Sequence, residues 1–451
     1  MLYRKIEKEL YTFYESEDTK ALMITGARQV GKTTTIEETG KKAFKHFIEI
    51  NFIENEEAKK LFQDTLDTES ILIRISALAN QDLVPNETLI FFDEVQVCKE
   101  IVTEIKFLVK DGRYKYILSG SLLGTELQDI RSFPVGYMDI LQMYPLDLEE
   151  FAMANGVSNM VMRALRECFM EYHPVDSLIH EKMMELFRLY LIVGGMPNAV
   201  NEFLKTNDLR RVNQIQQAIV RLYKKDITQY DPNNKFLIED IFDLIPSELN
   251  AKNKRFIMKN IKADFKFKRY YESFLWLKNA GVALPVYSVS EPKIPLLLSK
   301  QVNYFKLFLN DVGLLASMSM DNVQIKILKK EKDINFGSIY ENMAAQELSA
   351  HGFDLYYFNS KKQGELDFVM EENSLVVPIE IKSGKDYKRH HALSSVLNNS
   401  EYEIEKAYVF YNGNVEKMEK ILYLPIYMLM FIEKEKFPDS FIYKPNLDVL
   451  K

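Results

Sequence analysis

Cysteine is scarce in this sequence of 451 residues, which contains only Cys98 and Cys168. The two lie far apart and match no metal-binding spacing, so we expect a reducing cytoplasm and neither a disulfide scaffold nor a zinc motif. Long apolar runs are also missing: the most apolar late stretch, residues 421–432, contains Pro425 and is too short to span a membrane. Residues 1–9 lack the apolar stretch of a signal peptide. These shortages predict a cytoplasmic protein with no membrane partner.

Positive charge is not in excess either, because 58 Lys and Arg stand against 65 Asp and Glu, a net charge of −7. A chain with this balance is no polycation, so any surface that binds nucleic acid must be local. The apolar content of 47% and the charged content of 27% are typical of a folded globular protein, and the length allows several domains.

A phosphate-binding loop follows the first apolar stretch, and its pattern G-x-x-x-x-G-K-T runs from Gly26 to Thr33. Its two glycines let successive N–H groups point into one concavity, and the helix after them directs the positive end of its dipole there. We expect Lys32 to reach the β- and γ-phosphates of ATP and Thr33 to bind Mg²⁺. The expected nucleotide-binding residues here are Gly26, Ala27, Arg28, Gln29, Val30, Gly31, Lys32, Thr33 and Thr34.

Apolar strands are predicted at residues 21–25, 45–51, 88–92 and 114–118, with helical patterns between them. This alternation predicts a parallel sheet covered on both faces. Asp93 and Glu94 follow the third strand, at the sheet edge where ligands collect. We expect Asp93 to hold Mg²⁺ through water and Glu94 to polarise the attacking water. Ser119 or Ser121, after the fourth strand, is a candidate γ-phosphate sensor, although Ser-Gly-Ser is also an ordinary turn.

With these motifs, the chain resembles the AAA-type ATPases, in particular a prokaryotic family with a poorly characterised C-terminal domain. The resemblance extends to residues 145–151, 194–197, 276–281 and 305–315. It implies an ATPase core at residues 1–150, a helical lid at residues 151–235, and ATP with Mg²⁺. Such ATPases usually complete the site with an arginine from a neighbouring subunit or a lid, which implies a homo-oligomer. Arg131 is the nearest candidate here and Arg113 the next.

Residues 236–330 read as a winged-helix-like segment. Residues 238–287 give helix, turn, helix, turn, helix and strand, with Pro246 starting one helix, Gly281 capping another and residues 282–287 as the wing. We expect the lone Trp276 in the core. Basic residues crowd this segment and could contact DNA phosphates, but a solvated helical face or a protein-binding winged helix would also explain them. The DNA-binding candidates are Lys254, Arg255, Lys259, Lys262, Lys266, Lys268 and Arg269.

The sequence of residues 331–451 predicts a helix, a strand at residues 354–358 and then a hairpin, with strands near 364–370 and 375–382. Alternation along the strands brings Asp367, Glu380 and Lys382 to one face, where Glu341 from the helix can join them. This set resembles the Asp…Glu-x-Lys pattern of restriction-endonuclease-like nucleases. The resemblance implies that Asp367 and Glu380 bind Mg²⁺, that Lys382 positions a water, and that Glu341 completes the metal shell. Whether such a core cleaves DNA or only grips it stays open.

The predicted fold class is a multidomain α/β protein: a P-loop parallel-sheet ATPase, a helical lid, a winged-helix-like segment and a restriction-endonuclease-like domain. The function expected is an ATP-hydrolysing DNA-binding protein, a clamp or remodeller suited to repair, fork handling or defence. The alternative is a nucleotide-dependent switch that binds protein partners and not DNA. A small-molecule kinase fits less well, because the Asp93–Glu94 pair and the long lid suit hydrolysis better.

Overall fold

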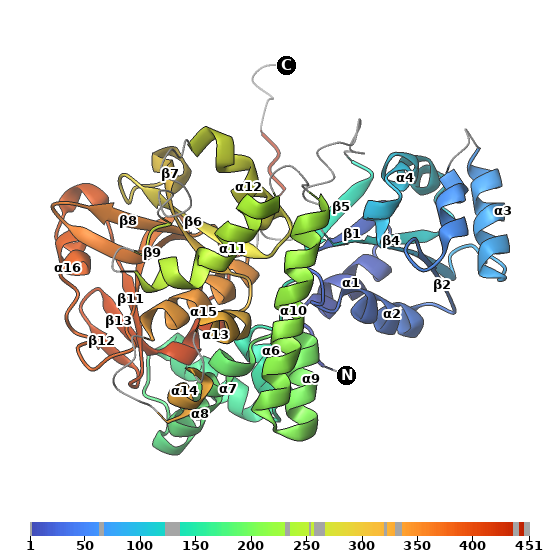
Figure 1. Cartoon of the computed structure of the whole chain (residues 1–451). Helices are drawn as coiled ribbons and strands as arrows, with labels where there is room; N and C mark the ends of the chain where they lie inside the picture. The colour runs from blue at the N-terminus through green and yellow to red at the C-terminus, as the bar shows by residue number, and fades with distance from the viewer. Residues whose placement is uncertain are drawn as a thin grey trace.

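A computed structural model describes residues 2–62, 67–121, 136–230, 235–251, 254–256, 267–319, 323–329, 336–435 and 442–445. Two sheets organise these residues, one in the N-terminal third of the chain and one in the C-terminal half. Figure 1 shows the first sheet in blue and cyan and the second in yellow, orange and red, with helix α10 between them. No helix in the described part is both long and apolar enough to cross a membrane.

The N-terminal sheet has five strands in the order β2-β3-β4-β1-β5, all parallel to their neighbours. The strands are β1 (Ala21–Thr25), β2 (His46–Asn51), β3 (Thr88–Asp93), β4 (Lys115–Ser119) and β5 (Met138–Gln142). The helices of this part are α1 (Ile6–Glu15), α2 (Lys32–Ala43), α3 (Thr68–Ala79) and α4 (Glu100–Asp111). The sequence predicted the first four strands and missed β5.

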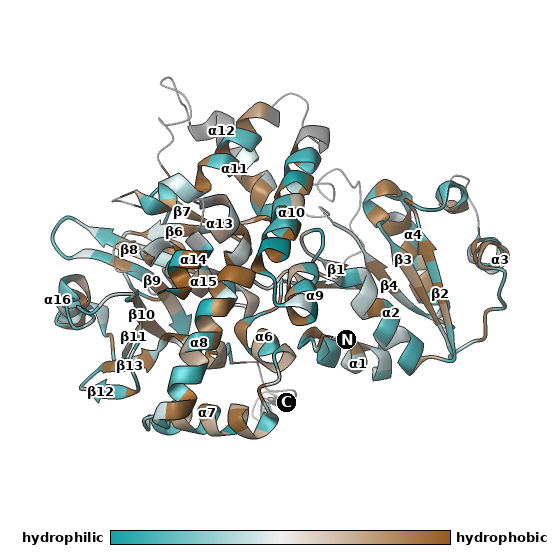
Figure 2. Ribbon diagram, turned by 60° about the horizontal axis from the view of Figure 1, so that its bottom comes forward, coloured by the Kyte–Doolittle hydropathy of each residue, from teal (hydrophilic) through white to brown (hydrophobic). Residues whose placement is uncertain are grey.

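Helices cover both faces of this sheet. One face packs on α3 and α4 through residues such as Met23, Phe92 and Leu118, and the other packs on α1 and α2 through residues such as Ile24 and Phe91. Strand β3 is buried along its whole length, and Figure 2 colours it as hydrophobic. A strand buried on both faces must be continuously apolar, so the predicted two-sided parallel sheet is confirmed.

Helices then link the two sheets. They are α6 (Leu148–Ala154), α7 (Asn159–Glu171), α8 (Ser177–Val193), α9 (Pro197–Thr206), α10 (Leu209–Tyr230), α11 (Lys235–Asn250) and α12 (Phe267–Asn279). The break between α8 and α9 holds Gly194 and Gly195. A Cβ on Gly195 would lie 2.0 Å from the carbonyl oxygen of Leu146, so the close approach of these two backbones requires glycine.

The C-terminal sheet is mixed, with eight strands in the order β12-β13-β11-β10-β9-β8-β6-β7. Its strands are β6 (Ala283–Val289), β7 (Lys300–Leu309), β8 (Tyr356–Ser360), β9 (Gly364–Glu372), β10 (Leu375–Ile381), β11 (Ala407–Tyr411), β12 (Glu416–Met418) and β13 (Ile421–Pro425). The accompanying helices are α13 (Val312–Ser319), α14 (Val323–Leu328), α15 (Gly337–Ala350) and α16 (His391–Leu397). The predicted hairpin is present as β9 and β10, which pair antiparallel across a turn at Asn373 and Ser374.

Two predictions for residues 236–330 were wrong. Strand β6, expected as a separate wing, pairs with β8 and β7 and therefore belongs to the C-terminal sheet. Pro246 does not start a helix but lies inside α11. The buried residues Ile238, Phe242 and Ile245 recur at helical spacing there, so tertiary packing outweighs the one backbone hydrogen bond that proline removes.

One hydrophobic core joins the two halves. It runs without a break from Leu22 and Ile24 in the first sheet, through Tyr190 and Tyr223 of the linking helices, to Val377 in the second. Where the two halves meet, Gly281 just after α12 takes a φ of +70°, and a Cβ there would lie 2.9 Å from the backbone nitrogen of Ala27. The segment that enters the second sheet therefore packs directly on the phosphate loop of the first.

Candidate nucleotide site and charged cluster

The phosphate loop curls between β1 and α2 as its sequence predicts. Gly26 and Gly31 take φ values of 140° and 95°. Glycine is required at position 26, because a Cβ would lie 2.2 Å from the carbonyl oxygen of Met143 on the neighbouring chain segment. Lys32 begins α2, and its Nζ donates to the carbonyl oxygens of Gly26 and Ala27, each at 2.9 Å. The ammonium group therefore lies inside the loop, at the place where phosphates would bind.

Burial changes the protonation of this lysine. Lys32 is 8% exposed, and burial lowers its pKa to about 8, against the opposing effect of Glu94 and Asp93. Among the described residues no carboxylate forms an ion pair with this buried ammonium, so the loop favours an anionic ligand that balances its charge.

Asp93 is the polar centre of the site at the end of β3. The Thr33 hydroxyl donates to its Oδ2 at 2.9 Å, and the Asn51 side-chain amide donates to the same oxygen at 3.2 Å. The Ser119 hydroxyl donates to Oδ1, and burial raises the pKa of Asp93. A hydroxyl beside a carboxylate is an oxygen set that suits Mg²⁺. Ser119 lies behind Asp93 and orients it, rather than facing the cleft as a γ-phosphate sensor would.

Glu94 follows Asp93 with a left-handed backbone, φ 57°. This conformation is costly for a residue other than glycine, and residues held in it often belong to functional sites. Its carboxylate lines the cleft of the phosphate loop and accepts a hydrogen bond from the buried Gln96. Glu94 is therefore placed to polarise a water, as its position after the strand suggested.

A cleft of about 680 Å³ opens at the loop, with Thr33 and Glu94 on one side and residues of α9 and α10 on another. The tip of the loop is tied to those helices. Arg28 donates to Asp226 at 2.6 Å, and Asn198 donates to Gln29 at 2.7 Å. Helices α9 and α10, from the segment predicted to form a lid, thus border the cleft. Its lining comprises Leu2, Arg4, Arg28, Gln29, Gly31, Lys32, Thr33, Thr34, Thr35, Glu38, Glu94, Pro197, Asn198, Asn201 and Leu222.

Only one of the two arginines predicted to complete the site lies in the described part of the chain. Arg131 lies outside the described residues. Arg113 donates to Asp111 at 2.6 Å and to Glu69 at 2.6 Å, and it does not line the cleft. Arg113 is therefore a surface ion-pair residue in this structure.

A second polar site lies in the C-terminal sheet, where the four predicted residues come together. Asp367 on β9 accepts a hydrogen bond from the Ile381 backbone N–H at 2.9 Å. Lys382 Nζ lies 2.5 Å from Glu380 Oε2. Glu341 comes from α15, and its charge acts on both Asp367 and Glu380. Glu341 and Glu380 are buried, at 1% and 3% exposure.

Two further lysines enter this cluster, which the sequence did not predict. Lys254 pairs with Glu341. Lys306 on β7 is fully buried, with its Nζ 2.9 Å from Glu365 and 3.6 Å from Glu341 Oε2. Glu341 Oε2 is itself buried and accepts no hydrogen bond from the described residues. The acids are therefore neutralised mainly by lysines of this chain, and we name this group (Lys254, Lys306, Glu341, Glu365, Asp367, Glu380, Lys382) the charged cluster.

The pKa values in the charged cluster follow from burial and from these neighbours. Burial and Asp367 raise the pKa of Glu380 to about 8. Burial would also raise the pKa of Asp367, but Lys254, Lys306 and Lys382 together outweigh it and the pKa is lowered. One carboxyl is thus held charged while its neighbour tends to hold a proton, a pattern found when carboxylates share a buried site.

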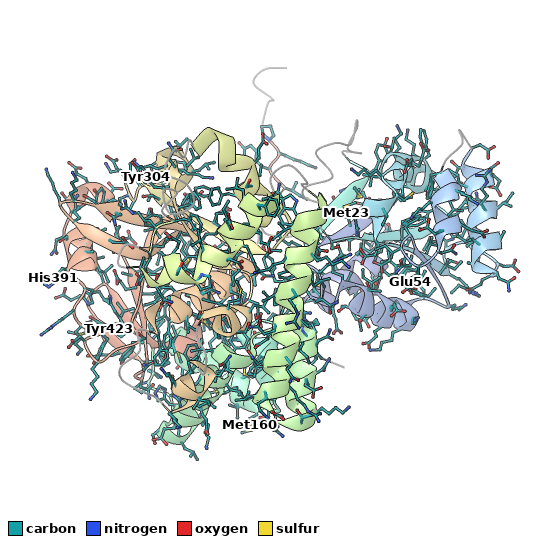
Figure 3. The ribbon with its side chains drawn as sticks, viewed as in Figure 1. Met23, Glu54, Met160, Tyr304, His391 and Tyr423 are labelled. Carbon is teal, nitrogen blue, oxygen red and sulfur yellow. The ribbon has the colours of Figure 1, made fainter. Side chains whose placement is uncertain are left out.

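The DNA-binding candidates are only partly described. Lys254 points inward to Glu341, and Arg255 lies over the rings of Tyr304 and Tyr357, 5.7 Å and 5.9 Å from their centroids. Figure 3 labels Tyr304 on β7, whose side chain is 52% exposed. The remaining candidates lie outside the described residues, or have side chains that do: Lys259, Lys262, Lys266, Lys268 and Arg269.

Three known families match successive parts of the chain. Residues 18–152 match the family described as AAA domain. Residues 184–324 and 336–429 match two domains of unknown function, DUF8612 and DUF4143. Residues 18–152 therefore form an AAA-type P-loop ATPase domain, in agreement with the loop and the acids described above.

Whole-chain comparisons add little. Among curated proteins, none matches the chain. The Thermotoga maritima RuvB Holliday junction branch migration motor is 13% identical, over 64% of this chain and 89% of its own, with a TM-score of 0.28. The Aeropyrum pernix Orc1 protein in complex with DNA is 11% identical, over 73% of this chain and 93% of its own, with a TM-score of 0.30. TM-scores this low support no inference about function.

Several polar residues at the two sites escaped the sequence analysis. Asn51 ends a predicted strand beside Asp93, and that position was the one available signal for it. Asn198 and Asp226 lie on helices whose faces could not be oriented in advance. Arg4 and Lys306 reach their sites from segments distant in sequence, so no local pattern marks them.

Proposed function

We propose that this chain is an ATP-hydrolysing protein that acts on DNA, in which the AAA domain drives assembly or closure of the C-terminal half around the nucleic acid. The observation that carries the ATPase part is the convergence of Lys32, Thr33, Asp93 and Glu94 at one cleft. Mg²⁺ held between Thr33 and Asp93 would supply positive charge to the phosphates and a template for in-line attack. Lys32 would neutralise the β- and γ-phosphates, and Glu94 would orient the attacking water.

A local excess of positive charge supports the proposed binding of DNA. Between residues 252 and 269 the chain has eight Lys or Arg and one acid, within a protein of net charge −7. Such a local excess favours contact with a phosphate backbone. The order α15, β8, β9, β10, α16, β11, with a mixed sheet and acids on its hairpin, further supports a restriction-endonuclease-like core.

For the charged cluster we propose a metal-dependent nuclease site that is closed in this structure. Its carboxylates suit Mg²⁺, and none of the described residues donates a hydrogen bond to the buried Glu341 Oε2. Asp367 and Glu380 would hold the ion, which would orient a scissile phosphate and acidify a water. Lys382 would position that water. Lys254 and Lys306 now supply the positive charge in the cluster, so an ion would have to compete with Lys254 for Glu341.

The test is DNA binding measured by fluorescence anisotropy with forked, linear duplex and single-stranded DNA, with and without ATP. We expect binding that weakens steeply between low and physiological salt, because phosphate contacts release counterions. A gel of the same DNA after incubation with Mg²⁺ then compares the wild type with Asp367→Ala. Cuts lost in the variant indicate an ATP-regulated nuclease, and binding without cuts indicates a clamp or remodeller. Absence of binding would contradict the DNA role and favour a switch that binds proteins.

A further inference from the structure

Arg4, just before α1, is a buried arginine that the mechanism above does not use. It is 5% exposed, and its guanidinium contacts three separate segments. Nη1 donates to the Val30 carbonyl oxygen at 2.8 Å, Nη2 donates to the Tyr144 carbonyl oxygen at 2.6 Å, and Nε donates to Glu150 Oε2 at 3.2 Å. One side chain therefore ties the phosphate loop, the segment after β5 and helix α6 together.

The contact with Val30 has a consequence for phosphate binding. A peptide bond is planar and trans, so the carbonyl of one residue and the N–H of the next point in opposite directions. By holding the Val30 carbonyl on its own side, Arg4 turns the Gly31 N–H the other way. Gly31 and Arg4 both line the nucleotide cleft. Arg4 thus fixes one of the loop donors without needing to touch a phosphate itself.

Glu150 holds Arg4, and it is held in turn by the N-terminus of α6. Asp147 and Glu150 form a capping box, and Glu150 Oε1 also accepts from the Lys5 backbone N–H at 2.6 Å. Asp147 pairs with the Lys5 ammonium at 2.7 Å. These contacts leave the Arg4 guanidinium little freedom to move relative to α6.

Helix α15 also contacts the N-terminus of α6. The Glu347 carboxylate accepts from the Leu148 backbone N–H at 3.1 Å and 3.2 Å, and His351 Nε2 lies 3.4 Å from Asp147 Oδ2. Six residues before Glu347, the same helix carries Glu341 into the charged cluster. The rigid helix α15 thus connects the charged cluster to the end of α6 that holds Arg4.

We propose that Arg4 is a positioning residue for ATP hydrolysis and that α15 sets its place through α6, so that the C-terminal half tunes the ATP site. This inference rests on the proposed ATPase function. The phosphate loop is efficient only when its N–H groups are oriented before the nucleotide arrives, and a small misplacement can cost about a hundredfold in rate.

The test compares Arg4→Ala, Arg4→Lys and Glu347→Gln in the full chain, with Lys8→Ala as the control because Lys8 is an exposed cation on α1, four residues after Arg4. Steady-state kcat and KM for ATP are measured, together with binding of a fluorescent ATP analogue and thermal melting. We expect Arg4→Ala to lower kcat by about ten- to a hundredfold. Arg4→Lys should recover part of it, because the single nitrogen of lysine can reach Val30 but cannot span the three acceptors that three guanidinium nitrogens contact. Glu347→Gln should lower kcat by a few fold, and Lys8→Ala should match the wild type.

Added guanidinium should partly restore turnover in Arg4→Ala, which a purely structural role would not predict. Arg4→Ala that melts like the wild type and turns over ATP like Lys8→Ala would overturn the positioning role. A kcat for Glu347→Gln equal to that of the wild type would overturn the claim that α15 sets the position of Arg4. If the wild type and Lys32→Ala show the same turnover, the proposed ATPase function fails instead. In that case, binding of the fluorescent ATP analogue still tests whether Arg4 orients the phosphate loop. If it does, Arg4→Ala must bind the analogue more weakly than Lys8→Ala does.

Discussion

At the scale of single residues, the buried lysine of the phosphate loop controls nucleotide affinity through its charge. Burial lowers the pKa of Lys32 to about 8, so the free protein holds a charged lysine below that pH and a neutral one above it. Phosphates bind the charged form. Linkage therefore requires ATP affinity to fall as the pH rises through about 8, by up to tenfold per pH unit.

This first prediction is tested by the Kd for a fluorescent ATP analogue between about pH 7 and 9.5, a range in which the phosphates are already ionised. Lys32→Ala is the control, and its weak binding should not vary with pH. A wild-type Kd that stays constant up to the top of this range would contradict the assigned role of Lys32.

Lys254 is the residue whose removal should expose the charged cluster. Lys254→Ala takes away the partner of Glu341 and leaves more negative charge in a buried site, so we expect divalent-cation affinity to rise at least tenfold. Mn²⁺ binding followed by electron paramagnetic resonance measures it, in a Lys32→Ala background that removes the nucleotide site. Lys385→Ala, an exposed lysine near the hairpin, should change nothing. If Lys254→Ala and Lys385→Ala bind Mn²⁺ with the same affinity, the charged cluster is not a metal site closed by Lys254.

The residues that could be predicted from sequence are those fixed by local pattern. The glycines, Lys32 and Thr33 follow from a loop motif, and Asp93 and Glu94 follow from the end of a buried strand. Asp367 and Glu380 follow from the two-residue period of a hairpin. The positions of Lys306 and Arg4 could not be predicted, and Lys254 was predicted only as a DNA-binding candidate, because each meets its partner only through the tertiary fold.

At the scale of elements, the N-terminus of α6 is the point at which three parts of the chain meet. Asp147→Ala would remove its cap and the buried carboxylate that pairs with Lys5 and His351, although Lys5 would keep Glu149 at 2.6 Å. Breaking a buried pair in this way costs about 3–5 kcal/mol. The free energy of unfolding in urea should fall by that amount.

Ser158→Ala is the matched control, because Ser158 caps α7 at an exposed site through one hydrogen bond to the Val161 N–H. Loss of such a cap costs about 1 kcal/mol. Equal losses in the two variants would show that the buried contacts of Asp147 add nothing to its capping role.

The sequence predicted strands of the first sheet from their apolar runs. It did not predict which strands pair when the partners lie far apart in the sequence. The four central strands of the first sheet are apolar runs and were found. Strand β5 is as short as β1 and β4 but largely exposed, so it lacked that signal. Strand β6 was found as a strand, but its partner β8 lies about seventy residues later, and no local feature of the sequence specifies that pairing.

At the scale of the whole molecule, one core joins the ATPase domain to the C-terminal half, so nucleotide and DNA are expected to act on a single unit. Figure 1 shows α10 standing between the two sheets, where it ties Arg28 of the loop through Asp226. A change at the phosphate loop therefore reaches α10, whose neighbours α11 and α13 pack on β7 of the second sheet.

Oligomer formation is a prediction at this scale. In the described part of the chain, Arg4 and Arg28 are the arginines that line the cleft, and each is bound to an acid. If a neighbouring subunit supplies the arginine that stabilises the transferring phosphoryl group, turnover per subunit must rise with protein concentration. A dilution series from micromolar to nanomolar protein measures it. Constant turnover per subunit across the series would contradict completion of the site by a neighbour.

The central claim is that ATP hydrolysis and DNA binding belong to one machine. The most direct measurement is the ATPase rate with and without forked, linear duplex and single-stranded DNA, with Lys32→Ala and Glu94→Gln as inactive controls. We predict that at least one DNA form raises wild-type turnover several-fold and that neither control responds. Wild-type turnover that is unchanged by every form of DNA, in a protein that hydrolyses ATP, would contradict the claim.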